Sequence, residues 1–191
     1  MGLPNILSLA RLALAPLFII IFMLGDRQGF VAALVMAFLI EFTDILDGYL
    51  ARKKNATSDF GKLIDPMADC ITHFSVFMCF LWAGYAHLWM IVIIFYREFI
   101  VAYIRVAAAL SGTVLAARMS GKLKAITQAV VAIAILVMIV FTPEDDTELV
   151  IRAKITAQWL MGLVTLVTLW SGIEYVLTNT VPIRAVLQRQ S

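Results

Sequence analysis

Charged side chains are scarce in this sequence. They make up 15% of its 191 residues, whereas 62% of the residues are hydrophobic. Ordinary soluble domains contain about 25% charged and about 45–50% apolar residues. A soluble fold of this size could not bury so much apolar surface, so the composition argues against that class and predicts an integral membrane protein. The length suits one compact helical bundle, a single domain over residues 1–191.

Cysteine is nearly absent, with only Cys70 and Cys79 in the chain. They form no CxxC pair, and their apolar surroundings favour small buried hydrophobes over a disulfide or a metal site. A basic segment before the first apolar run is also missing, Arg11 interrupts that run, and no cleavage site of the A-x-A type follows it. These absences argue against a signal peptide and predict a retained first helix.

Long apolar runs are abundant. A membrane-crossing helix needs about 20 residues to span about 30 Å of hydrocarbon. Six segments reach that length, and none repeats another: 5–24, 30–52, 59–85, 88–110, 121–141 and 153–177. The sequence therefore predicts an all-α fold of six transmembrane helices joined by short turns.

Basic residues alternate between the connections, which indicates orientation because short cytoplasmic loops retain Lys and Arg. One side carries Arg52, Lys53, Lys54, Lys62, Arg118, Lys122, Lys124, Arg184 and Arg189. The fifth connection, on the other side, carries Glu144, Asp145, Asp146 and Glu148, although Arg152 and Lys154 follow. We expect a multi-pass protein of the cell (inner, cytoplasmic) membrane with both termini in the cytoplasm.

Acidic residues gather in "DILDGYLARKKNATSDFGKLIDPMAD", which begins at Asp44 and joins the second and third segments. From Asp44, the helical offsets i+3, i+4, i+7 and i+8 fall on Asp47, Gly48, Ala51 and Arg52. These offsets define one stripe of a helix, on the cytoplasmic end of the second segment.

A second stripe follows on the third segment. From Gly61, Asp65 is i+4 and Asp69 is i+8, and Pro66 can kink the helix between them. The short polar connection over residues 53–58 makes the two helices antiparallel neighbours. The two stripes are therefore expected to face each other.

Four converging carboxylates would repel one another unless cations neutralise them. Their oxygens favour Mg²⁺, Mn²⁺ or Ca²⁺ over zinc, and metal pairs bridged by aspartates serve phosphoryl and nucleotidyl transfer. The arginine of the first stripe could offer a bidentate fork to a phosphate. The alternative is that these acids are solvated helix-end charges paired with Lys53, Lys54 and Lys62.

The pattern D-x2-D-G-x2-A-R-x8-G-x3-D-x3-D resembles the signature of the CDP-alcohol phosphotransferases. This sequence fits it at Asp44, Asp47, Gly48, Ala51, Arg52, Gly61, Asp65 and Asp69. The segments that resemble bacterial phosphatidylglycerophosphate synthases within that family are "LPNILSLAR", "YREFIVAYIR" and "SGKLKAITQ". The resemblance implies a six-helix membrane fold that joins CDP-diacylglycerol and sn-glycerol 3-phosphate, releasing CMP.

The resemblance also implies residue roles. Asp44, Asp47, Asp65 and Asp69 would hold two divalent cations, Mg²⁺ or Mn²⁺, and Asp69 would be the general base. Expected contacts to the CDP group are Asn5, Ser8, Gly48, Arg52 and Gly61. For Asn5 and Ser8 the alternative is helix N-capping. Relatives are often homodimers, so a homodimer is expected.

The acceptor phosphate needs cations. Candidates are Arg97, Arg105, Arg118, Lys122 and Lys124, of which the first two are i and i+8 on one helix face. Glu98 could orient one of these cations. The alternative for Arg97 is a structural ion pair with an acid such as Glu41, and for the lysines it is simple membrane topology.

Several alternatives stay open. Relatives often carry Lys or Arg where this chain has Cys70, and Thr where it has Ala125, so another acceptor such as inositol phosphate or serine remains possible. His73, i+4 from Asp69, is expected to be a packed polar residue rather than a ligand. A cation carrier that uses the acids for transport, and an inactive lipid-binding protein, are alternatives of other classes.

Overall fold

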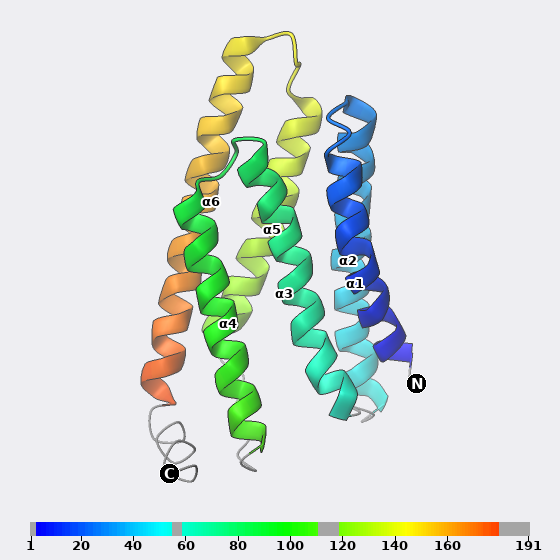
Figure 1. Ribbon diagram of the computed structural model, residues 1–191, viewed down its shortest axis with the longest axis vertical. Helices are drawn as coiled ribbons and strands as arrows, with labels where there is room; N and C mark the ends of the chain where they lie inside the picture. Colours follow the sequence, from blue (N-terminus) through cyan, green and yellow to red (C-terminus); the bar gives the residue numbers. More distant parts are fainter. Residues whose placement is uncertain (1–2, 55–58, 111–118, 180–191) are drawn as a thin grey trace.

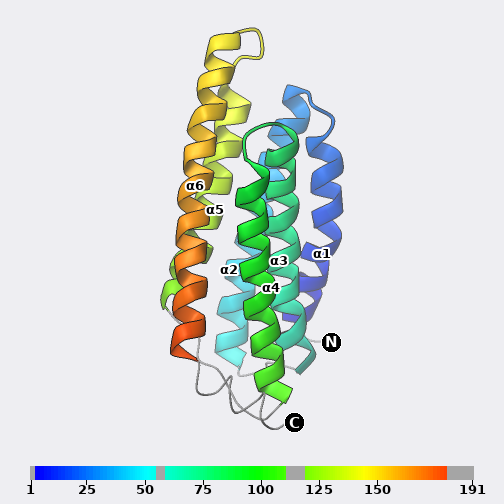
Figure 2. The same ribbon diagram turned by 60° about the vertical axis from the view of Figure 1, so that its left-hand side comes forward.

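Six helices make up the part of the chain that is described. The computed structural model describes residues 3–54, 59–110 and 119–179, and these ranges contain no strand. The helices are α1 (Leu3–Phe22), α2 (Arg27–Lys54), α3 (Asp59–Trp82), α4 (Leu88–Leu110), α5 (Met119–Phe141) and α6 (Thr147–Thr178). Successive helices run in opposite directions (Figures 1 and 2). The predicted all-α fold is confirmed for these residues.

Several helix boundaries differ from the predicted ones by a few residues, and for two of them the structure gives the reason. α3 ends at Trp82 rather than at residue 85, because Gly84 has a φ of 82°, a left-handed conformation that side chains with a Cβ rarely adopt. The Tyr85 amide then donates to the Phe80 carbonyl at 2.8 Å and closes the turn. α6 begins at Thr147 rather than at residue 153, because the Asp146 carboxylate accepts a hydrogen bond from the Leu149 amide and caps the helix.

The helices form two groups of three. α1 packs on α2 and α3, and α6 packs on α4 and α5. The groups join where α5 contacts α2 and α3, and where α3 contacts α4. At one end of the core an aromatic cluster fills the space between α1 and α3, with Phe22 and Phe80 edge to face at 6.4 Å between ring centroids. This packing holds α1 beside α3, so that side chains of the two helices can contact each other along their length.

Large apolar side chains cover the outside of the bundle, whereas several polar ones are buried. Trp159 is 75% exposed, but Arg11 and Gln128 are each only 2% exposed. α5 and α6 are long and apolar enough to cross a membrane, and shorter apolar stretches cover Ser8–Phe22 and Met67–Trp82. Apolar side chains outside and polar side chains inside fit a protein that is surrounded by lipid. The lengths and composition of the helices support a membrane protein, but they do not by themselves establish the predicted six spans.

Candidate active site

Two carboxylates from different helices meet at one arginine. Arg11 lies in α1, Asp44 in α2 and Asp69 in α3. The Arg11 Nη1 donates to Oδ1 of Asp69 at 2.5 Å and to Oδ1 of Asp44 through a shorter contact. The arginine is buried, whereas both aspartate side chains are 46% exposed. Asp44 and Asp69, far apart in the sequence, therefore face the same point.

The other residues of the acidic motif lie in the adjoining turns. Asp47, Gly48 and Arg52 belong to the final turns of α2, and Gly61 and Asp65 belong to the first turns of α3. Their side chains lie outside the described part of the structure, as does that of Asn5 in α1, and Arg118 lies outside the described residues altogether. Ser8 is fully buried inside α1, which begins at Leu3, so its position is not that of an N-cap.

Basic side chains of α4 and α5 form a second cluster around Glu98. Its Oε2 accepts from Arg97 Nη1 at 3.2 Å, and its Oε1 lies 2.5 Å from Lys124 Nζ. The ion pair suggested as the alternative for Arg97 is present, but its acid is Glu98, whereas Glu41 lies 3.3 Å from the His73 Nε2. Glu98 follows Arg97 directly in the sequence and accepts from one of its terminal nitrogens. His73 also contacts the Asp69 carbonyl through Nδ1, at 3.0 Å, and thus packs between α2 and its own helix.

A cavity of about 530 Å³ connects the two clusters. Asp44 and Asp69 line it from the first group of helices. The cationic residues that line it from the second group are Arg97, Arg105, Lys122 and Lys124. The Arg105 guanidinium carbon lies 5.4 Å from the centre of the Tyr175 ring, so α6 also contacts this wall. The structure thus brings an acid pair and a cation cluster to one space.

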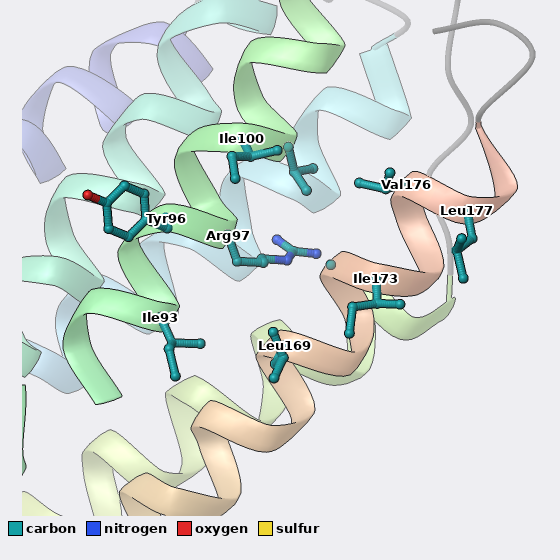
Figure 3. Close-up of a pocket in the computed structure, with 10 residues that line it drawn as sticks. Ile93, Tyr96, Arg97, Ile100, Leu169, Ile173, Val176 and Leu177 are labelled. Carbon is teal, nitrogen blue, oxygen red and sulfur yellow. The ribbon is translucent and has the colours of Figure 1, made fainter. Parts of the chain in front are cut away.

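A groove of about 420 Å³ lies between α4 and α6. Its walls are mostly aliphatic, and Arg97 is the charged side chain among them. Figure 3 shows Arg97 leaving α4 between Ile93 and Ile100 and pointing toward α6. Arg97 therefore borders both the groove and the cavity.

The model of the family described as CDP-alcohol phosphatidyltransferase matches residues 1–171, nearly the whole chain. The chain belongs to this family. Family members are membrane-bound transferases, which agrees with the apolar helices and with the predicted enzyme class.

Three curated relatives illustrate the range of the family. A Bacillus subtilis protein named CDP-diacylglycerol–glycerol-3-phosphate 3-phosphatidyltransferase is 38% identical over 147 residues, which cover 71% of this chain and 76% of the relative. A Mycobacterium tuberculosis protein named probable phosphatidylglycerophosphate synthase is 33% identical over 179 residues, covering 92% and 80%. A Streptomyces coelicolor protein named cardiolipin synthase (CMP-forming) is 39% identical over 98 residues, covering 50% and 46%.

Members of this family generally use divalent metal ions. The described acids fit such an ion, because the oxygens of Asp44 and Asp69 already converge on one positively charged nitrogen. Among the residues with described side chains, no group of three or more His, Cys, Asp or Glu lies close enough to hold a metal. The carboxylates of Asp47 and Asp65, which would add to the pair, are not among them.

Two residues of the site are not predicted by the sequence patterns. Arg11 interrupts an apolar run, and its signal is that a charge inside such a run is costly unless it is paired. Ser171 accepts a hydrogen bond from Arg97 Nη2 at 2.8 Å, and no sequence pattern indicates it. A serine in a long apolar helix is compatible with many partners.

Proposed function

We propose that this protein transfers the phosphatidyl group of CDP-diacylglycerol to sn-glycerol 3-phosphate, giving phosphatidylglycerophosphate and CMP. The observation that carries the proposal is one cavity lined by Asp44 and Asp69 from α2 and α3 and by Arg97 and Lys124 from α4 and α5. An acid pair suits a metal-bound diphosphate, and a cation cluster suits the phosphate of the acceptor. The names of the Bacillus and Mycobacterium relatives support the same reaction.

The donor end of the cavity would be built from α1, α2 and α3. Asp44, Asp47, Asp65 and Asp69 would hold two divalent cations, Mg²⁺ or Mn²⁺. When bound, such ions neutralise the donor diphosphate and the charge that develops on the departing CMP. The residues proposed to contact the CDP group are Asn5, Ser8, Gly48, Arg52 and Gly61.

The chemical step exchanges one phosphorus–oxygen bond for another. The acceptor hydroxyl oxygen attacks the phosphatidyl phosphorus, and the bond from that phosphorus to the CMP oxygen breaks. Asp69, which lines the cavity, takes the proton of the hydroxyl. The electron pair of the broken bond leaves with CMP.

The acceptor end would be built from α4 and α5. Arg97, Arg105, Lys122 and Lys124 would bind the phosphate of glycerol 3-phosphate, with Arg118 nearby in the chain. Glu98 holds both Arg97 and Lys124, so it keeps two cations together at this end. Binding there would place the acceptor hydroxyl toward Asp69.

The membrane arrangement follows the distribution of charge. We place the six helices across the cell membrane as a single domain, 1–191, with both termini and the cavity on the cytoplasmic side. In Figure 1 the last turn of α2 and the first turn of α3 lie at the lower end, opposite the acidic turn between α5 and α6. A lipid donor and a water-soluble acceptor could meet at that boundary. A homodimer is the proposed assembly.

Release of CMP from CDP-diacylglycerol by the purified protein tests the function. The panel of acceptors should include glycerol 3-phosphate, inositol phosphate and serine. We expect rapid CMP release with glycerol 3-phosphate and little with serine, because two or more cations of the cavity match a phosphate dianion. Inositol phosphate carries the same dianion, so its rate measures how far the rest of the acceptor is selected. The panel should also include phosphatidylglycerol as an acceptor, because one relative is named cardiolipin synthase (CMP-forming). Preference for another acceptor would move the assignment within the family, and no CMP with any acceptor would contradict it.

Removing divalent cations should abolish this activity. We expect no CMP release after treatment with EDTA, and recovery when Mg²⁺ or Mn²⁺ is added in excess, because the acid pair would then face the donor diphosphate without a counter-charge. Adding an equal ionic strength of KCl is the control for simple screening. Full turnover in EDTA would contradict a metal-dependent mechanism.

A further inference from the structure

Gly172 lets the stem of Arg97 lie directly on α6. A Cβ atom built on Gly172 would be 2.6 Å from Arg97 Cγ, closer than real side chains approach. The atom it would meet belongs to the stem near the backbone of α4, so the arginine could not simply swing its tip away. Arg97 and Gly172 are both buried. A residue larger than glycine at this position would displace the side chain.

Ser171 fixes the head of the same arginine. Its hydroxyl oxygen accepts from Arg97 Nη2 at 2.8 Å, and the serine is fully buried. Glu98 accepts from Nη1 on the other side at 3.2 Å. These two hydrogen bonds set the plane of the guanidinium, because each terminal nitrogen has a fixed partner. Among the described residues, the buried Nε has no hydrogen-bond partner, so one donor is uncommitted.

The same arginine borders the cavity that holds Asp44 and Asp69. α6 supplies no lining residue to that cavity, yet two of its consecutive residues determine where one of the cavity's cations lies. Figure 3 shows Arg97 reaching toward α6, on the side of the groove where Ile173 and Val176 lie.

We propose that Ser171 and Gly172 are positioning residues for the acceptor. They hold the Arg97 guanidinium in the orientation that binds the phosphate of glycerol 3-phosphate, Ser171 through its hydroxyl and Gly172 through its missing side chain. The inference rests on the proposed function, because it needs an anionic acceptor at Arg97. Neither residue touches the substrate.

Kinetics with each substrate varied separately provide the test. Without the Ser171 hydroxyl the guanidinium stays charged but loses its orientation. We expect the KM for glycerol 3-phosphate to rise about tenfold in Ser171→Ala, the loss expected for one hydrogen bond to a charged group. Gly172→Ala should give a rise of similar size. The KM for CDP-diacylglycerol and kcat at saturating acceptor should stay within about twofold in both variants.

Matched controls come from the same helix. In Thr165→Ala a buried hydroxyl is lost that donates to the Met161 carbonyl of its own helix at 2.8 Å. In Gly162→Ala the new Cβ would lie 3.9 Å from Cε of Met90, an ordinary van der Waals contact. Neither control should change the KM for glycerol 3-phosphate. Ser171→Thr keeps a hydroxyl and should recover most of the affinity lost in Ser171→Ala.

Different results would overturn the inference and the proposed function. A wild-type protein that releases no CMP with glycerol 3-phosphate overturns both. An active wild type overturns the inference alone if the KM for glycerol 3-phosphate is unchanged in Ser171→Ala and Gly172→Ala. It does so equally if the controls raise this KM as much as those variants, or if both KM values rise together. Thermal unfolding in detergent, measured for every variant, identifies effects that come from loss of fold.

Discussion

Asp69→Asn should lower the rate of CMP release by about a thousandfold or more, because one change removes both a proposed metal ligand and the proposed base. Asparagine has nearly the same shape as aspartate, but it carries no negative charge and does not accept a proton. The Asp69 carboxylate lines the cavity and points at Arg11 beside Asp44. Initial rates of CMP release with saturating glycerol 3-phosphate, Mg²⁺ and CDP-diacylglycerol measure the effect.

A loss of fold would produce the same loss of rate, so the variant needs a structural control. Arg11 keeps its contact with Asp44 in Asp69→Asn, and the melting temperature in detergent should therefore change little. Asp145→Asn, in the exposed turn between α5 and α6, removes an acid at the other end of the molecule and should leave the rate unchanged. Near-normal turnover by Asp69→Asn would exclude Asp69 from both roles.

Arg97→Ala should raise the KM for glycerol 3-phosphate by about a hundredfold, equivalent to about 2.7 kcal/mol. The change removes a buried guanidinium whose hydrogen bonds to a phosphate would be charge-assisted. Glu98 keeps Lys124 as a partner at 2.5 Å, so it is not left as an unpaired buried charge. The measurement is CMP release with glycerol 3-phosphate varied at saturating CDP-diacylglycerol, and then the reverse.

Two further variants complete that prediction, one that keeps the charge of Arg97 and one that serves as a control. Arg97→Lys retains the charge but not the planar fork, so only part of the affinity should return. Arg152→Ala removes an exposed arginine of α6 that pairs with Glu148, and it should have no effect on either KM. An equal rise in the KM for CDP-diacylglycerol in Arg97→Ala would place the arginine at the donor instead of the acceptor.

The long apolar runs in the sequence predicted the number and the order of the helices. Each long apolar run became one helix, because a helix satisfies its own backbone while its side chains face lipid or other helices. The predicted helices differ from the observed ones at their first and last residues. Residues 147–152 are polar enough to be read as a loop, but the Asp146 cap makes them the first turns of α6. At the end of α3, the turn depends on the positive φ of Gly84, which composition does not reveal.

For the candidate site, too, regular spacing was informative and contacts between distant residues were not predicted. Helical spacing placed Asp44 and Asp69 on facing stripes, and the structure brings them to one cavity. An ion pair of Arg97 was suggested with Glu41 as the example acid, but the structure pairs Arg97 with Glu98, because packing decides which acid a buried arginine meets. The contact with Ser171 joins residues 74 positions apart, and it has no counterpart in local sequence spacing.

The division of the bundle into two groups of three helices has an evolutionary consequence. The acids that would handle the nucleotide lie on α2 and α3, whereas the cations that would recognise the second substrate lie on α4 and α5. If these roles hold, mutations in one half would alter which alcohol is accepted while the residues proposed for the nucleotide stay unchanged in the other half. Such a division allows gene lineages to diverge toward new headgroups while they keep a single activated lipid as the common precursor.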